Sequence, residues 1–164
     1  MIRAAIVTVS DSVVAGTRQD RSGAALRERA EALGWQVIAQ ASVADEIDSI
    51  ASVLKELADS GKVSLILTTG GTGVSPRDVT PEAVRTVIQR EIPGLGEMMR
   101  AEGRKLTPFA ALSRSLAGVR GATLIVNLPG SPKGALESLD AIVQLIPHCI
   151  DLIEGRTRHA DVPN

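Results

Sequence analysis

Aromatic side chains are almost absent from this chain, which has one tryptophan, one phenylalanine and no tyrosine. Proteins that hold single-stranded nucleic acid use aromatic rings as stacking platforms, so the composition argues against that class. The formal net charge is −1, and no overall positive field draws the protein to nucleic acid or to anionic lipid. We therefore expect neither a nucleic acid nor a membrane as a partner.

Cysteine and histidine are equally scarce. The single cysteine, Cys149, excludes an internal disulfide bond and a cysteine-rich zinc site, and His148 and His159 are too few for a histidine metal cage. No apolar run reaches the roughly 20 residues that a membrane-spanning helix needs. Met1 leads directly into a strand-like segment, without the pattern of a signal peptide. The expectation is a soluble, cytoplasmic protein.

The 164 residues, of which 44% are apolar, suit one domain with a substantial core. Short apolar, β-branched segments alternate with segments in which apolar residues recur at helical spacing. The predicted strands cover residues 2–10, 35–43, 63–69 and 121–130. The predicted helices lie near residues 26–33, 47–57, 80–88, 93–104 and 136–153. We expect Thr80 to cap its helix, Pro147 to interrupt the last one, and Trp35 to be buried.

This alternation predicts an α/β fold with a mostly parallel sheet that helices cover on both faces. We expect one domain over residues 1–155 and a loose tail over 156–164. Ligands of such folds bind outside the carboxyl ends of the strands. Polar clusters follow each predicted strand, at residues 10–12, 44–46, 68–73 and 128–132.

The cluster TTGGTG is a glycine-rich loop directly after the third predicted strand. Gly70, Gly71 and Gly73 have no Cβ, so their N–H groups can approach a ligand and form an anion-binding concavity. The hydroxyls of Thr69 and Thr72 add donors. The spacing fits neither a Walker A loop nor a dinucleotide fingerprint. It indicates a phosphate or pyrophosphate site, and a tight turn without a ligand is the alternative.

Acidic residues accompany this loop. Asp78 can hold a divalent cation beside the phosphates, or it can cap a helix or pair with Arg77. Asp45 and Glu46 end the second strand, where they can favour a helix dipole. Adjacent parallel strands would bring Asp45 near the glycine loop. Two carboxylates that face one anion-binding loop are the arrangement expected for metal-assisted phosphoryl or nucleotidyl transfer.

The remaining clusters have open roles. Ser10 can donate to a phosphate and Asp11 can accept from a sugar or base, although both suit a simple turn. Gly130 and Ser131 offer another backbone-donor turn. In the segment PFAALSRS, Ser113 and Arg114 form a polar patch. The Arg114 guanidinium can clamp an acidic ligand group or form a surface ion pair, and the ion pair is slightly favoured for this residue in isolation.

Five segments taken together closely resemble the molybdopterin adenylyltransferase family, which includes bacterial Mog-type enzymes and the G domains of plant Cnx and of gephyrin. The resemblance covers residues 3–155 in order. The segments are VTVSDSVVAGTRQDRSG, VADEI, TGGTGVSPRDVTPEAV, TPFAALSRSLAGVRGATLIVNLPGSP and the closing helix. The family resemblance implies a three-layer α/β/α sandwich that assembles as a homotrimer. It also implies adenylylation of molybdopterin by Mg²⁺-ATP with release of pyrophosphate, followed by molybdate insertion by another protein.

By position, the resemblance makes Asp45 and Asp78 the essential acids, with Mg²⁺ as the cofactor that they hold. It makes residues 70–73 the nucleotide-phosphate loop. The further pocket residues are Ser10, Asp11, Ser113, Gly130 and Ser131. The alternative is a non-catalytic molybdopterin-binding or scaffold module of the same fold. A nicotinamide oxidoreductase is disfavoured by the glycine spacing and by the missing ribose-binding acid.

Overall fold

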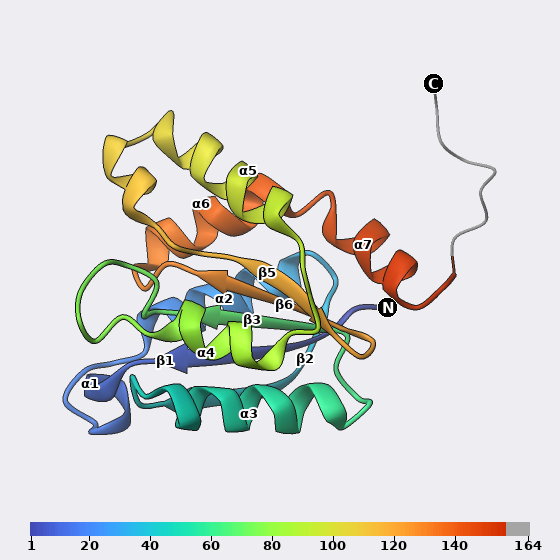
Figure 1. Ribbon diagram of the computed structural model, residues 1–164, viewed down its shortest axis with the longest axis horizontal. Helices are drawn as coiled ribbons and strands as arrows, with labels where there is room; N and C mark the ends of the chain where they lie inside the picture. The colour runs from blue at the N-terminus through green and yellow to red at the C-terminus, as the bar shows by residue number, and fades with distance from the viewer. Residues whose placement is uncertain (157–164) are drawn as a thin grey trace.

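The structure is a computed structural model that describes residues 1–156 (Figure 1). Six strands form one sheet in the order β2-β1-β3-β6-β5-β4. The strands are β1 (Arg3–Val9), β2 (Gln36–Val43), β3 (Leu65–Thr69), β4 (Arg90–Glu91), β5 (Ala117–Arg120) and β6 (Thr123–Leu128). The neighbours from β2 to β6 pair in parallel, whereas β5 pairs antiparallel with β6 and with β4. The predicted mostly parallel sheet is confirmed.

Helices cover both faces of this sheet, so the three-layer α/β/α prediction is also confirmed (Figure 1). One face carries α2 (Arg21–Ala32), α5 (Pro93–Arg104), α6 (Pro132–Ile142) and α7 (Ile146–Ile153). The other face carries α3 (Ile47–Asp59) and α4 (Thr80–Val87). Within residues 1–156, no helix has the length and apolar character needed to cross a bilayer.

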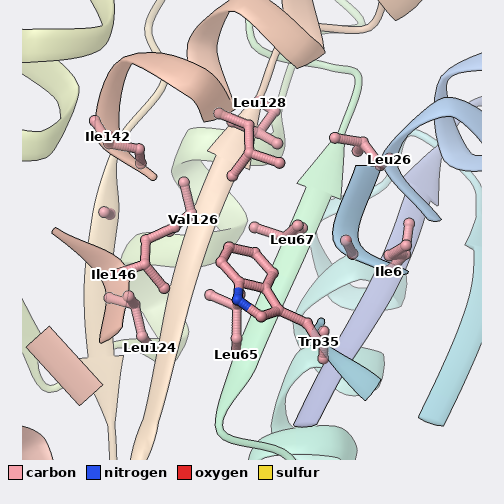
Figure 2. Close-up of a cluster of buried hydrophobic side chains, with 14 of the residues drawn as sticks. Ile6, Leu26, Trp35, Leu65, Leu67, Leu124, Val126, Leu128, Ile142 and Ile146 are labelled. Atoms are coloured by element: carbon pink, nitrogen blue, oxygen red, sulfur yellow. The ribbon is translucent and has the colours of Figure 1, made fainter. Parts of the chain in front are cut away.

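Each strand supplies both cores because successive side chains point to opposite faces. Leu65 and Leu67 of β3 pack under α2, α6 and α7, while Ile66 between them packs against α3 and α4. Figure 2 shows the first of these cores, with the indole of Trp35 against the leucines of β3. Trp35 is only 8% exposed, which confirms the expected burial.

Four short elements do not appear among the elements predicted from the sequence. They are β4, β5, the one-turn helix α1 (Asp11–Val14) and the 3₁₀ helix η1 (Pro108–Leu112). Strands of two and four residues are too short to show an apolar alternation, and β4 is held only by its pairing with β5. The helix α1 is one turn long and depends on a cap, in which the Ser10 side chain accepts from the Val13 N–H. Such elements are fixed by long-range or capping contacts rather than by periodicity.

Two helix ends differ in detail from the prediction. Thr80 is the first residue of α4 instead of its cap, and its hydroxyl donates to the Gly70 carbonyl at 2.8 Å. The last helix is interrupted as expected, but the break falls at residues 143–145. Pro147 then lies in the first turn of α7, where its missing N–H costs no helical hydrogen bond. The tail predicted over residues 156–164 lies, from residue 157 on, outside the described residues, as does His159.

Replacing Leu67 with alanine tests the central position of β3. Leu67 is fully buried, so we expect Leu67→Ala to lower the free energy of unfolding by about 2–5 kcal/mol through lost burial and a residual cavity. Leu106→Ala is the control because Leu106 is 63% exposed, and its effect should stay within about 0.5 kcal/mol. Urea unfolding measures both, and equal losses would contradict this account of the core.

Candidate functional site

The predicted site residues gather at the carboxyl edge of the four parallel strands. Ser10 and Asp11 follow β1, Asp45 follows β2, residues 70–73 follow β3, and residues 129–131 follow β6. The expectation that Asp45 approaches the glycine loop because their strands are adjacent is wrong, since β1 lies between β2 and β3. Asp45 therefore lies next to the end of β1, and its carboxylate extends beyond this strand end to Gly71 of the loop.

The glycine loop passes very close to its neighbours at its first two residues, Gly70 and Gly71. Gly70 has a φ of 103°, and a Cβ there would lie 2.3 Å from the Val9 carbonyl oxygen. Gly71 has a φ of 68°, and its Cβ would lie 2.3 Å from the Thr80 hydroxyl. Both backbone conformations are ones that side-chain-bearing residues rarely adopt. The turn therefore requires glycine at both positions.

This loop presents unused backbone donors. The N–H groups of Gly71, Thr72 and Gly73 donate no hydrogen bond to another group of residues 1–156, and neither do those of Gly130 and Ser131. The loop is anchored instead through its first amide, which donates from Gly70 to the Leu128 carbonyl at 3.1 Å. Successive free amides at the end of a strand form a concavity suited to an anion.

Asp45 is fixed to the end of β1 by a reciprocal pair of hydrogen bonds. The Asp11 N–H donates to Asp45 Oδ2, and the Asp45 N–H donates to Asp11 Oδ1, both at 2.9 Å. The other carboxylate oxygen, Oδ1, would lie 3.4 Å from a Cβ on Gly71. The Asp45 carboxylate is thereby held beside the glycine loop with one oxygen unused.

Asp78 lies beside the other end of the loop, at Gly73. It closes a turn with Ser75, whose N–H donates to Asp78 Oδ2 and whose carbonyl accepts from the Asp78 N–H, both at 2.9 Å. A Cβ on Gly73 would lie 2.8 Å from Asp78 Oδ2. The alternative pairing of Asp78 with Arg77 is not observed, because Arg77 forms its ion pair with Asp11. The two acids therefore flank the residues 71–73.

The charges in this cluster shift the pKa of two carboxyl groups in opposite directions. Burial, together with the negative charges of Asp11 and Asp78, raises the pKa of Asp45 despite the N–H that it accepts. The backbone N–H of Asp45 and the Arg77 guanidinium lower the pKa of Asp11. Asp45 is thus an acid whose negative charge lacks full compensation, and a bound cation would supply it.

Two cavities meet at the glycine loop, sharing Gly71, Gly130 and Ser131 in their walls. The first measures about 290 Å³ and includes Ser10 and residues 18–22 before and within α2. The second measures about 440 Å³ and extends from Asp78 and Ser113 to the apolar side chains of α5 and η1. The edge of the sheet is therefore hollowed on both sides of the loop.

Two positions have roles that the sequence alone did not indicate. The ion pair that was one alternative for Arg114 is confirmed with Glu82, and Arg114 also donates to the carbonyls of Gly73 and Asp78 at 2.7 and 2.6 Å. Asp20 was missed altogether. It accepts from the Thr8 hydroxyl at 2.8 Å and from the Gly23 N–H at 2.9 Å, and it lines the first cavity. An acid directly before the first residue of a helix was the pattern that could have indicated this cap.

The fold and the site together define a class: α/β proteins with a glycine-rich, amide-presenting loop at the carboxyl edge of a mostly parallel sheet. Residues 5–148 match a family model described as "Probable molybdopterin binding domain". The chain belongs to this family.

Named relatives support the same assignment. A protein of Helicobacter pylori (strain J99) named molybdopterin adenylyltransferase is 41% identical over 165 residues, which cover 99% of this chain and 94% of the relative. The Escherichia coli (strain K12) protein of that name is 37% identical over 174 residues, covering 94% and 86%. The crystal structure of the molybdopterin biosynthesis enzyme MoaB from Thermus thermophilus superposes with a TM-score of 0.89 at 52% identity, covering 94% and 98%. The resemblance noted from the sequence is confirmed.

An alanine at Gly70 tests the tight turn. Its Cβ would meet a backbone oxygen, so we expect Gly70→Ala to displace the loop and to lower the free energy of unfolding by more than backbone strain alone. Gly34→Ala is the matched control, with a φ of 76° and open space around it, and should cost only about 1–2 kcal/mol. Urea unfolding and amide NMR shifts at Val9 and Leu128 report the difference, and identical spectra for Gly70→Ala and the parent would refute the close approach.

Proposed function

We propose that this protein is a molybdopterin adenylyltransferase, which transfers the adenylyl group of ATP to molybdopterin and releases pyrophosphate in molybdenum cofactor biosynthesis. The observation that carries the proposal is the placement of Asp45 beside Gly71 and of Asp78 beside Gly73, next to a loop with free amides. The names of the relatives in Helicobacter pylori and Escherichia coli support it.

The main obstacle to this reaction is repulsion between two polyanions. A terminal phosphate of one substrate must approach the α-phosphorus of ATP. In this proposal the free amides of residues 71–73 donate to the nucleotide phosphates and act as preorganised donors. The phosphate monoester is already largely ionised at neutral pH, so neither acid needs to act as a base.

The residues present fit a Mg²⁺ ion that the nucleotide brings with it. Within residues 1–156, no three His, Cys, Asp or Glu side chains converge as a complete metal site. Mg²⁺ usually takes one or two carboxylates and completes its shell with phosphate oxygens and water. Asp45 and Asp78 would supply these carboxylates, and the charge of the ion would offset that of the phosphates. The raised pKa of Asp45 agrees with a carboxylate that gains from a nearby cation.

The two cavities suit the two substrates. Ser10 lines the first cavity and Asp11 follows it after β1, Ser113 lines the second cavity, and Gly130 and Ser131 line both. We assign these five residues to substrate binding. ATP and molybdopterin would then meet at the glycine loop, which both cavities include. We further propose that the protein works in the cytoplasm and passes its product to a separate molybdate-inserting protein.

Removing one carboxylate tests the metal-dependent reaction. We expect Asp78→Asn to fold normally and to lower the rate of molybdopterin-dependent pyrophosphate release about 100-fold or more, the scale seen for the loss of one preorganised electrostatic group. Asp45→Asn should behave alike. Asp48→Asn is the control, since Asp48 is exposed in the first turn of α3 and has no place in the cluster.

The same assay separates catalysis from mere binding. Pyrophosphate release by the parent protein should require Mg²⁺ as well as ATP and molybdopterin. If the parent binds molybdopterin but releases no pyrophosphate under any of these conditions, the protein is a non-catalytic binding module and the proposal of an enzyme is wrong. If Asp78→Asn is as fast as the parent, the acid has been assigned the wrong role.

The family resemblance further predicts a homotrimer. Leu145, directly before α7, and Leu152, within α7, are 43% and 55% exposed, and they offer apolar surface for such contacts. Light scattering after size exclusion should give three times the 17.2 kDa of one chain. A single-chain mass at micromolar concentration would contradict the trimer.

A further inference from the structure

Arg114 donates three hydrogen bonds to the loop that carries Asp78. Its backbone N–H donates to the Thr72 carbonyl at 2.8 Å, and its Nε donates to the Gly73 carbonyl at 2.7 Å. Its Nη2 donates to the Asp78 carbonyl at 2.6 Å. The remaining Nη1 forms an ion pair with Glu82 of α4. The Arg114 side chain thus donates hydrogen bonds to both ends of the segment 73–78.

This segment has few other connections to the rest of the protein. Its internal hydrogen bonds join Ser75 to Asp78, and Val74 at its tip is 67% exposed. Apart from Arg114, the hydrogen bonds that tie residues 73–78 to more distant parts of residues 1–156 come from Arg77, which donates to Asp11. The position of Asp78 therefore depends largely on the planar guanidinium, whose donors have a fixed spacing.

The guanidinium of Arg114 forms its ion pair with the Glu82 carboxylate. The hydrogen bond from Arg114 lowers the pKa of Glu82. Arg114 reaches the backbone oxygen of Asp78, while no ion pair within 4.0 Å joins the Asp78 carboxylate to a lysine or arginine of residues 1–156. The Asp78 carboxylate is therefore held in place without an ion pair to a basic side chain of residues 1–156.

Contacts with α5 hold the backbone that carries Arg114 in place. Arg100 of α5 donates through Nη1 to the Ser115 carbonyl at 2.7 Å, and the Ser113 hydroxyl donates to the Ser115 hydroxyl at 3.0 Å. A Cβ at Gly96 would lie 2.8 Å from that same Ser115 carbonyl, so α5 packs directly against the segment. Arg114 thus projects from a fixed support rather than from a free loop.

We propose that Arg114 is a positioning residue, which fixes the segment 73–78 and so holds the Asp78 carboxylate at the glycine loop. The Arg114 guanidinium forms its ion pair with Glu82, so the Asp78 carboxylate stays available to a bound cation. The metal-binding part of this inference rests on the proposed function. The positional part rests only on the contacts described above.

Arg114→Lys is the variant that tests this inference, because lysine keeps the charge but lacks the planar fork. Hydrogen exchange in the segment 73–78 of the free protein is reported by the Ser75 and Asp78 amides, whose N–H groups are hydrogen-bonded. It should become about 10- to 100-fold faster, as expected when the hydrogen bonds from the charged guanidinium to this segment are lost. The Mg²⁺ concentration that gives the half-maximal rate of pyrophosphate release should rise by a factor of about 10 or more, and the rate should recover at high Mg²⁺.

Arg120→Lys is the matched control. Arg120 also pairs with a carboxylate, that of Asp59 at 2.9 Å, and donates to the Val87 carbonyl at 3.1 Å. It lies at the opposite edge of the sheet, at the end of β5. We expect this variant to lose stability without faster exchange at residues 73–78 and without a change in the Mg²⁺ dependence.

The outcomes separate the two proposals. Unchanged exchange at residues 73–78 in Arg114→Lys, or equal acceleration in both variants, would overturn the positioning role. Faster exchange with an unaltered Mg²⁺ dependence would overturn the link to the cation. If the parent protein releases no pyrophosphate at all, the proposed function fails, and the exchange measurement still decides whether Arg114 fixes the segment. Should Arg114→Lys be too unstable, Arg114→Ala with added guanidinium ion at millimolar concentration should restore slow exchange.

Discussion

The close approach of Gly70 to the backbone of β1 is the constraint on which the site depends. A distance of 2.3 Å between a hypothetical Cβ and the Val9 carbonyl oxygen leaves no room for any side chain. The chain must therefore leave β3 as bare backbone, and its next amides remain free of protein partners within residues 1–156. Because β1, β2, β3 and β6 are parallel, every polar residue that follows them lies at the same edge as these amides.

The electrostatics of that edge follow a consistent pattern. Both arginines near the acids have other carboxylate partners, Arg77 with Asp11 and Arg114 with Glu82. Neither Asp45 nor Asp78 forms an ion pair with a lysine or arginine of residues 1–156. Burial, together with the negative charges of its neighbours, raises the pKa of Asp45. Such an arrangement is unfavourable for the free protein and favourable for a complex that brings a divalent cation.

The fold could be predicted where periodicity is strong and not where elements depend on distant contacts. The buried strand β3 is apolar on both faces, and α3 repeats its apolar residues every three or four positions, so both were found. The strand β4 has two exposed residues and exists only through its pairing with β5. The break before α7 was anticipated from Pro147, but its position at residues 143–145 was not, because proline is compatible with the first turn of a helix.

The sequence by itself determined the α/β class and the family, because strand and helix patterns alternate along the chain and five segments match the family in order. The site residues remain a prediction from the polar clusters after the strands, since such clusters also suit simple turns and helix caps. Only the tertiary structure decided which partner each charged group takes. Arg77 reaches Asp11 across 66 positions rather than its neighbour Asp78, and Arg114 binds carbonyls 41 and 36 positions away. Side chains adjacent in sequence can point apart, whereas strand order brings distant ones together, and hydrogen bonds form only over a few ångströms.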